Sequence, residues 1–369
     1  MTQPAPVVML SPSSIFCAAL ELSSTKWKVA FGSGERHRLA TVDAGDWKSL
    51  FEEIGKARLR LGIDETTRLT TCYEAGRDGF WIHRELVSRG ITSQVVDPSS
   101  IKVDRRARRS KTDTLDALSL LELLLRHARG ERGVWRVLKV PTPEDEDARR
   151  LHRERERLIR ERTGHTTRVK ALLALQGLKL GDFRYADAVL SRLPPGLRAE
   201  VVREIERRTL VEKQLKTLAE ERTVAIQKRQ LPSAEKIELL EQLRAIGPTS
   251  ASVLVAELFG WREFKNGKQV GACAGLTPTP YSSGEREREQ GISKAGNRRV
   301  RTLCVEIAWQ WLRYQPESQL SKWFEARFSK GGGRSRRLGI VALARKLLVA
   351  LWRYTEFGLV PEGALMKAE

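Results

Sequence analysis

The chain has 369 residues, of which 41% are hydrophobic, and this length predicts two or three domains with sizeable cores. Its 66 Lys and Arg outnumber its 46 Asp and Glu, giving a net charge of +20 and a pI near 10.1, which predicts a polyanionic partner such as nucleic acid. No segment approaches the roughly 18 uninterrupted apolar residues of a membrane span, and the amino-terminal residues lack the features of a signal peptide. We therefore expect a cytoplasmic protein with no membrane partner.

The first third of the chain predicts strands and helices in the order βββαβαβα. Short apolar runs bounded by Ser and Gly indicate the strands, and apolar side chains at helical spacing indicate the helices. The expected strands are residues 15–22, 27–31, 36–41, 69–73 and 92–96, and the expected helices are residues 47–54, 80–87 and 113–127. That order matches the ribonuclease H topology, whose fourth strand lies beside its first.

Four acidic residues occupy special positions in this pattern. Glu21 interrupts an apolar strand, and Glu74 follows the fourth strand. Asp113 and Asp116 open a helix with Thr112 as its N-cap, and their i, i+3 spacing places both carboxylates on one face, about 5–6 Å apart. Each acid taken alone is better explained as a solvated charge or a helix-start acid. Together they predict a Mg²⁺ site, with Mn²⁺ as an alternative metal, of the kind that neutralises a phosphodiester under attack.

A strongly basic segment lies immediately before the Asp pair. It carries six cations and Asp104, so its net charge is +5, and we expect it to bring nucleic acid phosphates to the metal site. A solvated loop or a localisation signal would have the same composition. The six cations are Lys102, Arg105, Arg106, Arg108, Arg109 and Lys111.

The middle of the chain predicts a long helical hairpin. Residues 144–175 and 197–229 are rich in Arg and Glu, and each carries only a thin apolar stripe. Such stripes bury little surface, so we expect this coiled-coil-like hairpin to pack on another protomer or to lie along nucleic acid. An ordinary helical spacer is the alternative.

The last third of the chain predicts a mainly helical domain. Ile246-Gly247-Pro248, followed by a helix at residues 250–258, resembles one helix-hairpin-helix element, whose backbone amides hold phosphate, although Gly-Pro is also a common turn. A helix at residues 338–352 follows three glycines and carries two cations, so we expect it to pack on this domain.

A loop rich in Pro, Ser and Gly carries Ser282 and Ser283 in the last third of the chain. It precedes a cationic stretch in which Lys294, Arg298 and Arg299 are expected to contact nucleic acid. We expect the four cysteines and five histidines to be structural, because no CxxC or HxxxH spacing indicates zinc. The cysteines are Cys17, Cys72, Cys273 and Cys304.

Seven motifs, in order across residues 16–352, carry a family resemblance. They resemble the IS one-ten family of DEDD-type insertion-sequence transposases, which are relatives of the Piv invertase. The motifs are ALELSSTKWKVAF, TCYEAGRDGFWIHREL, VVDPSSIKVDRRARRSKTDTLDA, LRAIGPTSASVLVAEL, GACAGLTP, YSSG and GISKAGNRRVR.

The resemblance implies three domains. These are a RuvC-like ribonuclease H domain at residues 1–140, a coiled-coil hairpin at residues 141–235 and a serine-bearing transposase domain at residues 236–369. It also implies a bridge-type non-coding RNA that pairs with donor and target DNA, dimers that join into a tetramer, and a place at the bacterial nucleoid.

The resemblance also assigns roles to particular residues. Ser283 takes the nucleophile position, and Glu74, Asp113 and Asp116 take the second to fourth acidic positions. Glu21 departs from the usual Asp, and its extra methylene moves the carboxylate by about 1.5 Å.

We therefore expect DNA cleavage and rejoining through a covalent phosphoserine link, with Mg²⁺ bound by the acids. Two alternatives are a RuvC-like structure-specific nuclease that uses water and a nucleic-acid-binding relative disabled at Glu21.

Overall fold

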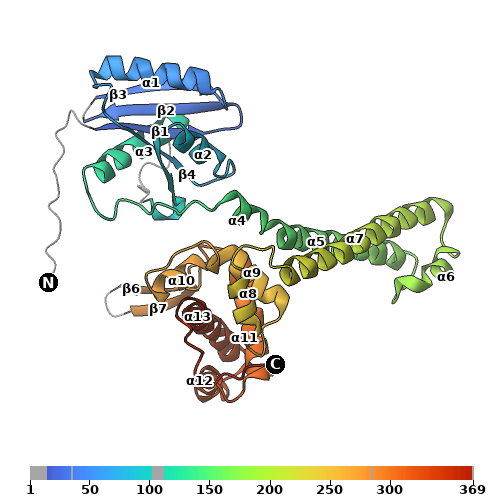
Figure 1. The fold of residues 1–369 in the computed structure, drawn as a ribbon. Helices are drawn as coiled ribbons and strands as arrows, with labels where there is room; N and C mark the ends of the chain where they lie inside the picture. Colours follow the sequence, from blue (N-terminus) through green and yellow to red (C-terminus); the bar gives the residue numbers. More distant parts are fainter. Residues whose placement is uncertain (1–14, 35, 102–111, 284–285, 368–369) are drawn as a thin grey trace. The chain divides into compact units, whose positions relative to one another are not determined.

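The structure is a computed structural model that describes residues 15–34, 36–101, 112–283 and 286–367. The chain forms two compact units, Met1–Val140 and Pro141–Glu369 (Figure 1). The first is a mixed α/β unit and the second is mainly helical, which confirms the expected fold class at that level. In the described part of the chain, no helix is both long enough and apolar enough to span a membrane.

The first unit is built on a five-stranded sheet in the order β3-β2-β1-β4-β5. β2 pairs antiparallel with β1 and β3, whereas β4 pairs parallel with β1 and β5. The prediction that the fourth strand lies beside the first is confirmed. The strands are β1 (Phe16–Leu22), β2 (Lys26–Ser33), β3 (Arg36–Asp43), β4 (Leu69–Glu74) and β5 (Thr92–Val96).

Helices cover both faces of this sheet. Alternate residues of a strand point to opposite faces, so Phe16 and Leu20 pack with α1 (Trp47–Leu61) and α2 (Trp81–Ser88). Cys17 and Ala19 pack on the other face against α3 (Asp113–Ala128), and a short turn, η2 (Pro98–Ser100), follows β5 (Figure 1). Burial raises the pKa of the Cys17 thiol to about 12, which agrees with a structural role for this cysteine.

The second unit begins with a helical hairpin. Its long arms are α5 (Arg150–Ala174) and α7 (Pro195–Gln227), and α4 (Pro143–Asp147), η4 (Phe183–Tyr185) and α6 (Ala186–Leu190) complete it. The single helix expected from residue 144 is instead two helices. The chain turns at Arg149, whose guanidinium lies over the Trp261 ring at 5.1 Å and whose Nε donates to the Asp145 carbonyl.

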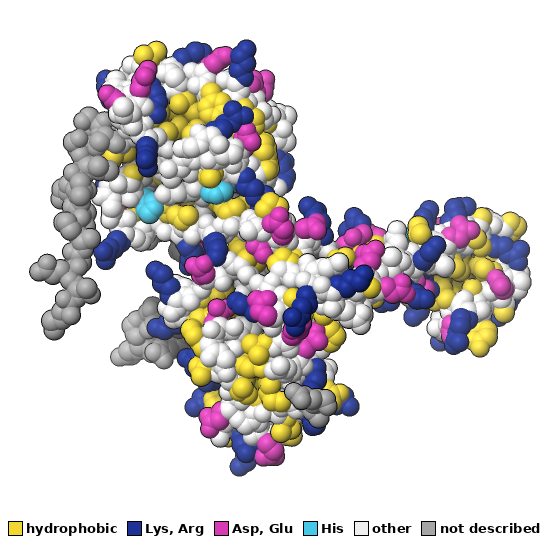
Figure 2. Space-filling view, in the orientation of Figure 1, with side chains coloured by type: hydrophobic (Ala, Val, Ile, Leu, Met, Phe, Trp, Pro, Cys, Tyr) yellow, Lys and Arg dark blue, Asp and Glu magenta, His cyan; other side chains and the backbone are white. Residues whose placement is uncertain are grey.

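The hairpin has a small core near its turn and buries few side chains along the rest of its length. The buried residues of that core are Val169, Leu172, Leu173, Leu180, Ala186, Leu193 and Val201. Only Val201 and Val211 of α7 are buried, and exposed pairs such as Arg168 with Glu200, worth about 0–1 kcal/mol each, join the two arms. Figure 2 shows positive and negative side chains interspersed along the hairpin. The face of the hairpin seen in this view therefore has no patch of a single charge sign.

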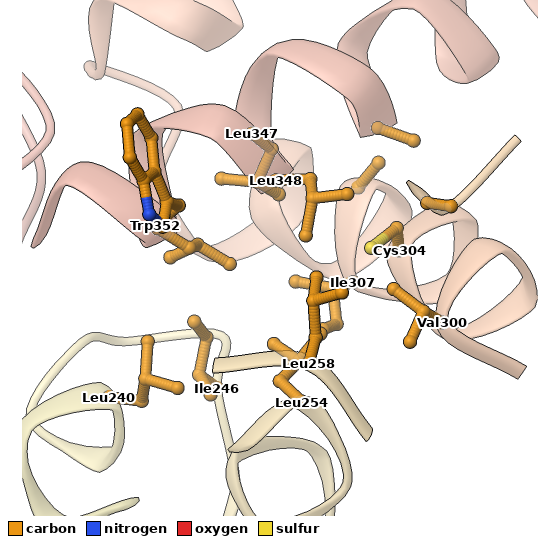
Figure 3. Packing of buried hydrophobic residues seen from close by; sticks show 14 of the residues in the cluster. Leu240, Ile246, Leu254, Leu258, Val300, Cys304, Ile307, Leu347, Leu348 and Trp352 are labelled. Carbon is orange, nitrogen blue, oxygen red and sulfur yellow. The ribbon is translucent and has the colours of Figure 1, made fainter. Parts of the chain in front are cut away.

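The rest of the second unit encloses the largest hydrophobic core. Leu254 and Leu258 meet Val300 and Ile307, and Leu348 packs beside them (Figure 3). The elements are α8 (Ala234–Glu241), α9 (Pro248–Leu254), the π-helix η5 (Val255–Phe259), α10 (Gly267–Cys273), α11 (Arg298–Tyr314), α12 (Gln319–Phe328) and α13 (Gly333–Phe357).

Two predicted helix boundaries and one predicted loop in this unit were wrong. The helix expected at residues 250–258 begins at Pro248 and widens into the π-helix, and the last helix begins at Gly333, inside the glycine run that hid its start. The expected loop around Ser283 is a hairpin of β6 (Pro278–Ser283) and β7 (Arg286–Ile292). β7 alternates charged residues of both signs, so it lacks the apolar period that marks a strand.

The core predicts a large difference between buried and exposed leucines of the second unit. Leu348→Ala removes a side chain with 0% exposure and should lower the free energy of unfolding by about 2–5 kcal/mol, because it leaves a cavity. Leu210→Ala, at a leucine with 56% exposure on α7, should change it by less than about 0.5 kcal/mol. Urea unfolding of the two variants measures both values, and equal decreases would contradict this assignment of the core.

Candidate active site

The parallel pairing of β1 and β4 brings two of the predicted acids to the same edge of the sheet. Leu20 pairs with Tyr73, so the next residues, Glu21 and Glu74, lie at the same level on adjacent strands. Both share the face of Cys17 and Cys72, which is the face that α3 covers. The other neighbour of β1 is the antiparallel strand β2, and the other neighbour of β4 is the parallel strand β5. In open α/β sheets, ligands bind at the carboxyl ends of two adjacent strands whose chain connections run in opposite directions.

Glu21 and Glu74 line a pocket of about 380 Å³. The turn after β1 forms one wall, and there the Ser23 hydroxyl donates to the Lys26 carbonyl and accepts from the Lys26 amide. The segment after β4 forms the other wall, and the Tyr73 hydroxyl, donating to the Gly79 carbonyl at 3.0 Å, fixes it. Both walls are therefore held by hydrogen bonds close to the two carboxylates.

The N-terminus of α3 points towards this same edge. A side chain on Gly32, which pairs with Cys17 near the start of β1, would meet Leu121 of α3 at 2.9 Å. The charge of Arg129, at the end of α3, acts on the Cys17 thiol. α3 therefore runs opposite to β1, and its first turn lies towards the end of β1, where Glu21 is found.

Asp113 and Asp116 continue the line of the buried stripe of α3 into its first turn. They precede Ala117 and Leu120 by four residues, and there Asp113 is exposed and Asp116 is half-buried. From Leu121 back to Asp113 the helix rises about 12 Å, while β1 advances about 13 Å from Cys17 to Glu21. These ideal rises would bring the Asp pair towards the level of the Glu pair, but the residues that line the pocket of Glu21 and Glu74 include neither Asp113 nor Asp116.

The expected helix start is confirmed, because the Thr112 hydroxyl accepts the Leu115 amide. Within the described residues, no three side chains of His, Cys, Asp or Glu form a group that could hold a metal ion. The four-acid metal site therefore stays a prediction.

The predicted basic segment lies outside the described residues, and so do all six of its cations. The structure describes the other expected cations. Lys294 is exposed and has a left-handed backbone with φ 56°, Arg298 is the first residue of α11, and Arg299 donates from Nε to Glu156 of α5 at 2.5 Å. Arg299 therefore ties the helical hairpin to the C-terminal core.

The predicted nucleophile lies at the end of a strand. Ser283 is the last residue of β6 and its backbone pairs with Arg286, while Ser282 pairs with Glu287. Gly284 lies outside the described residues. The hairpin joins the core through the Ser293 amide, which donates to the Thr277 carbonyl at 2.8 Å. The backbone of Ser283 thus belongs to a two-stranded hairpin that is joined to the core at its base.

The sequence analysis missed a buried carboxylate, Glu257, in the π-helix. It is 1% exposed, and His152 Nε2 and Arg153 Nε lie 2.7 and 2.8 Å from its Oε1. The Asn297 amide donates to its Oε2, while the Asn297 side-chain oxygen caps α11 by accepting the Arg299 and Val300 amides. One carboxylate therefore joins the base of α5, the π-helix and the start of α11.

The environment of Glu257 keeps it ionised. Burial alone raises the pKa of this carboxyl, but hydrogen bonds with His152 and Arg153 outweigh burial, and the pKa lies well below its ordinary value. Glu257 interrupts the apolar run from Val253 to Phe259. The same signal singled out Glu21, so the sequence contained a clue to this residue.

Comparison with known proteins connects this arrangement to a family. Residues 237–322, which include Glu257, Ser283 and Asn297, match the model described as Transposase IS116/IS110/IS902 family. A Sinorhizobium fredii protein named "Putative transposase y4rJ" is 43% identical over 95% of this chain and 94% of its own length. The chain belongs to this transposase family. The recognition from sequence motifs is confirmed to that extent.

More distant relatives are also named as transposases of insertion sequences. The transposase for insertion sequence element IS1111A of Coxiella burnetii is 28% identical over 73% of each chain. The transposase for IS1328 of Yersinia enterocolitica is 26% identical over 81% of this chain and 89% of its own. The similarity therefore includes both compact units rather than the matched C-terminal segment alone.

The Glu257 cluster predicts a pH-dependent contribution to stability. Glu257→Gln should lower the free energy of unfolding by about 2–3 kcal/mol at pH 7, because it removes charged hydrogen bonds. Since the folded pKa is depressed, the contribution is present above the unfolded value of about 4.3 and is lost as the pH falls below it. The gap between wild type and variant in urea unfolding should therefore shrink from pH 6 to pH 3.

An exposed pair supplies the control for this measurement. Glu317 lies 3.1 Å from Lys322 with 74% of its side chain exposed, so Glu317→Gln should cost less than about 0.5 kcal/mol. A wild-type advantage over Glu257→Gln that stays constant down to pH 3 would contradict the ionised cluster.

Proposed function

We propose that this transposase cuts and rejoins the DNA of an insertion sequence and that its first unit is a RuvC-like ribonuclease H domain. One observation carries the proposal: Glu21 and Glu74 end two adjacent parallel strands in a single pocket, towards which the first turn of α3 points. The strand order and the antiparallel β1-β2-β3 meander agree with a ribonuclease H fold. Position and chemistry therefore support the same assignment.

Mg²⁺ is the cofactor that this donor set fits, because carboxylate oxygens are the ligands that hard divalent cations prefer. Glu21, Glu74, Asp113 and Asp116 would hold it, and Mn²⁺ would substitute. The bound metal would neutralise charge on the scissile phosphate. Glu21 replaces the usual Asp of the family, and a carboxylate of either length ligates Mg²⁺.

Ser283 is the proposed nucleophile for strand exchange. Its hydroxyl oxygen bonds to the phosphorus, the bond from phosphorus to the departing strand breaks, and the serine proton passes to the departing oxygen. The phosphoserine ester keeps the bond energy, so a hydroxyl of another DNA strand reverses the step and restores Ser283. A nuclease that uses water would lose that energy.

A bridge-type RNA is the proposed source of sequence choice, and pairs of dimers the proposed assembly. The net charge of +20 supports a nucleic acid partner. The helical hairpin supports assembly, because its stripes bury little within one chain and Leu175 and Leu210 stay more than half exposed. Both parts of this proposal rest on the family resemblance together with these two features.

The serine proposal predicts a covalent adduct that one residue controls. Ser283→Ala should bind DNA normally but form no protein-DNA adduct, because no other hydroxyl takes its place, whereas Ser282→Ala should keep the adduct. Denaturing gel electrophoresis with labelled DNA, followed by peptide mapping, measures both. Adduct mapped to Ser282, or normal recombination by Ser283→Ala, would sink the assignment.

The four acids should control formation of the same adduct through the bound metal. Asp116→Ala, or wild type in excess EDTA, should form less than about one-hundredth of the wild-type adduct, whereas Glu21→Asp should keep or raise it. Free DNA ends without adduct would indicate the RuvC-like nuclease, and binding without any cutting would indicate a disabled relative.

The RNA proposal predicts that the purified protein carries one discrete structured RNA. Sequencing this RNA and altering its unpaired loops should redirect the DNA sites that are joined. Unchanged site choice after RNase treatment would remove the guide from the account.

A further inference from the structure

The second unit has a large groove formed mainly by its last two helices. Its volume is about 1,490 Å³, above the roughly 300–1,000 Å³ of pockets for small molecules, so it suits a chain better than a small molecule. Residues of α12, α13 and the segment after α13 line it, together with Pro278 and Ile292 at the base of the hairpin that carries Ser283. The groove therefore leads to the proposed nucleophile's hairpin.

Two glycines let α10 pack closely against α13 beside this groove. A side chain on Gly267, which lines the groove, would meet Val349 of α13 at 2.6 Å, and one on Gly271 would meet Arg345 at 3.1 Å. Val349 and Arg345, which both line the groove, therefore lie where the two helices meet. Larger residues at either glycine would separate the two helices.

The groove combines an apolar floor with a cationic rim. Trp323, Phe328 and Val341 form part of the floor. The charged residues of the lining are five cations and one carboxylate, Glu362, and none of the five cations makes an ion pair with a described residue. The cations are Lys268, Lys294, Arg345, Lys346 and Arg353.

We propose that this groove binds a segment of single-stranded DNA, with phosphates on the rim and bases on the floor around Trp323. Five cations against one carboxylate complement a polyanion. An apolar floor selects unpaired bases, because a duplex keeps its bases stacked inside, whereas single strands stack them on aromatic side chains. The Lys346 ammonium and the Arg327 guanidinium lie over the Trp323 ring at 4.7 and 5.6 Å, so a base that stacks on this ring would displace one of these cations, which could then meet a phosphate.

The choice of DNA over other polyanions rests on the proposed function. Strand exchange releases unpaired ends, and the groove lies beside the hairpin that carries Ser283. The binding itself needs neither metal nor serine, so it is measured in EDTA, where the chemistry does not occur.

The test is fluorescence anisotropy with a short labelled single strand of DNA. The double variant Lys346→Glu with Arg353→Glu should bind at least about tenfold more weakly, and its salt slope should be smaller by about 0.7 for each phosphate that the variant no longer binds. Lys228→Glu with Arg313→Glu reverses two exposed cations outside the groove and should weaken binding less than about threefold. Equal weakening in the two double variants would overturn the site.

A second arm isolates the bases from the phosphates. Wild type should bind an abasic strand about tenfold more weakly than a normal strand, while Trp323→Ala should bind both alike and Trp323→Phe should restore most of the difference. No preference of wild type for bases would overturn the stacking floor. Tighter binding of unpaired RNA, abolished in the same variants, would replace DNA as the occupant.

Two further outcomes distinguish DNA binding in the groove from contact between copies of the chain and from the proposed chemistry of Ser283. Groove variants that bind DNA normally but change the sedimentation coefficient would make the groove an interface between copies and overturn the proposal. Ser283→Ala should bind the strand as wild type does. Normal strand binding in a protein that forms no adduct would contradict the proposed function alone.

Discussion

The parallel pairing of β1 with β4 is the constraint on which the candidate active site depends. Register along parallel strands is fixed by backbone hydrogen bonds and by side chains that must enter the core on one face. A slip of one residue would send Glu21 to the face of α1 and bury a carboxylate among Phe16, Leu20 and Trp27. The energetic cost of that burial therefore helps to hold both acids at the edge of the sheet.

A second carboxylate organises the other unit. Glu257 sits in a π-helix, an irregular turn that places its side chain against α5 and the cap of α11. Removing Glu257 would leave the side-chain amide of Asn297 without this acceptor. Asn297 caps the start of α11 and lies five residues after the end of β7. The position of the serine-bearing hairpin thus depends on an ionised group some distance along the chain. The bond from Arg299 to Glu156 strengthens the same junction.

The sequence predicted most of this where periodicity was strong. All five strands of the sheet, the helix that starts at Asp113 and its Thr112 cap were found from apolar patterns and capping chemistry. The β6-β7 hairpin was missed because β7 has no apolar face. The cluster around Glu257 was missed because its partners His152 and Arg153 lie more than 100 residues away along the chain. Interactions of that kind follow from packing, and no local spacing encodes them.

We propose that the four acids, with a bound Mg²⁺, and Ser283 act on the same phosphate. Replacing a non-bridging oxygen of the cleaved phosphate by sulfur tests it directly, because Mg²⁺ binds oxygen in preference to sulfur while softer metals accept sulfur. The account predicts that this DNA forms little Ser283 adduct with Mg²⁺ and regains it with Mn²⁺ or Cd²⁺. Equal adduct formation with Mg²⁺ on both sulfur diastereomers would contradict contact between the metal and the phosphate that the serine attacks.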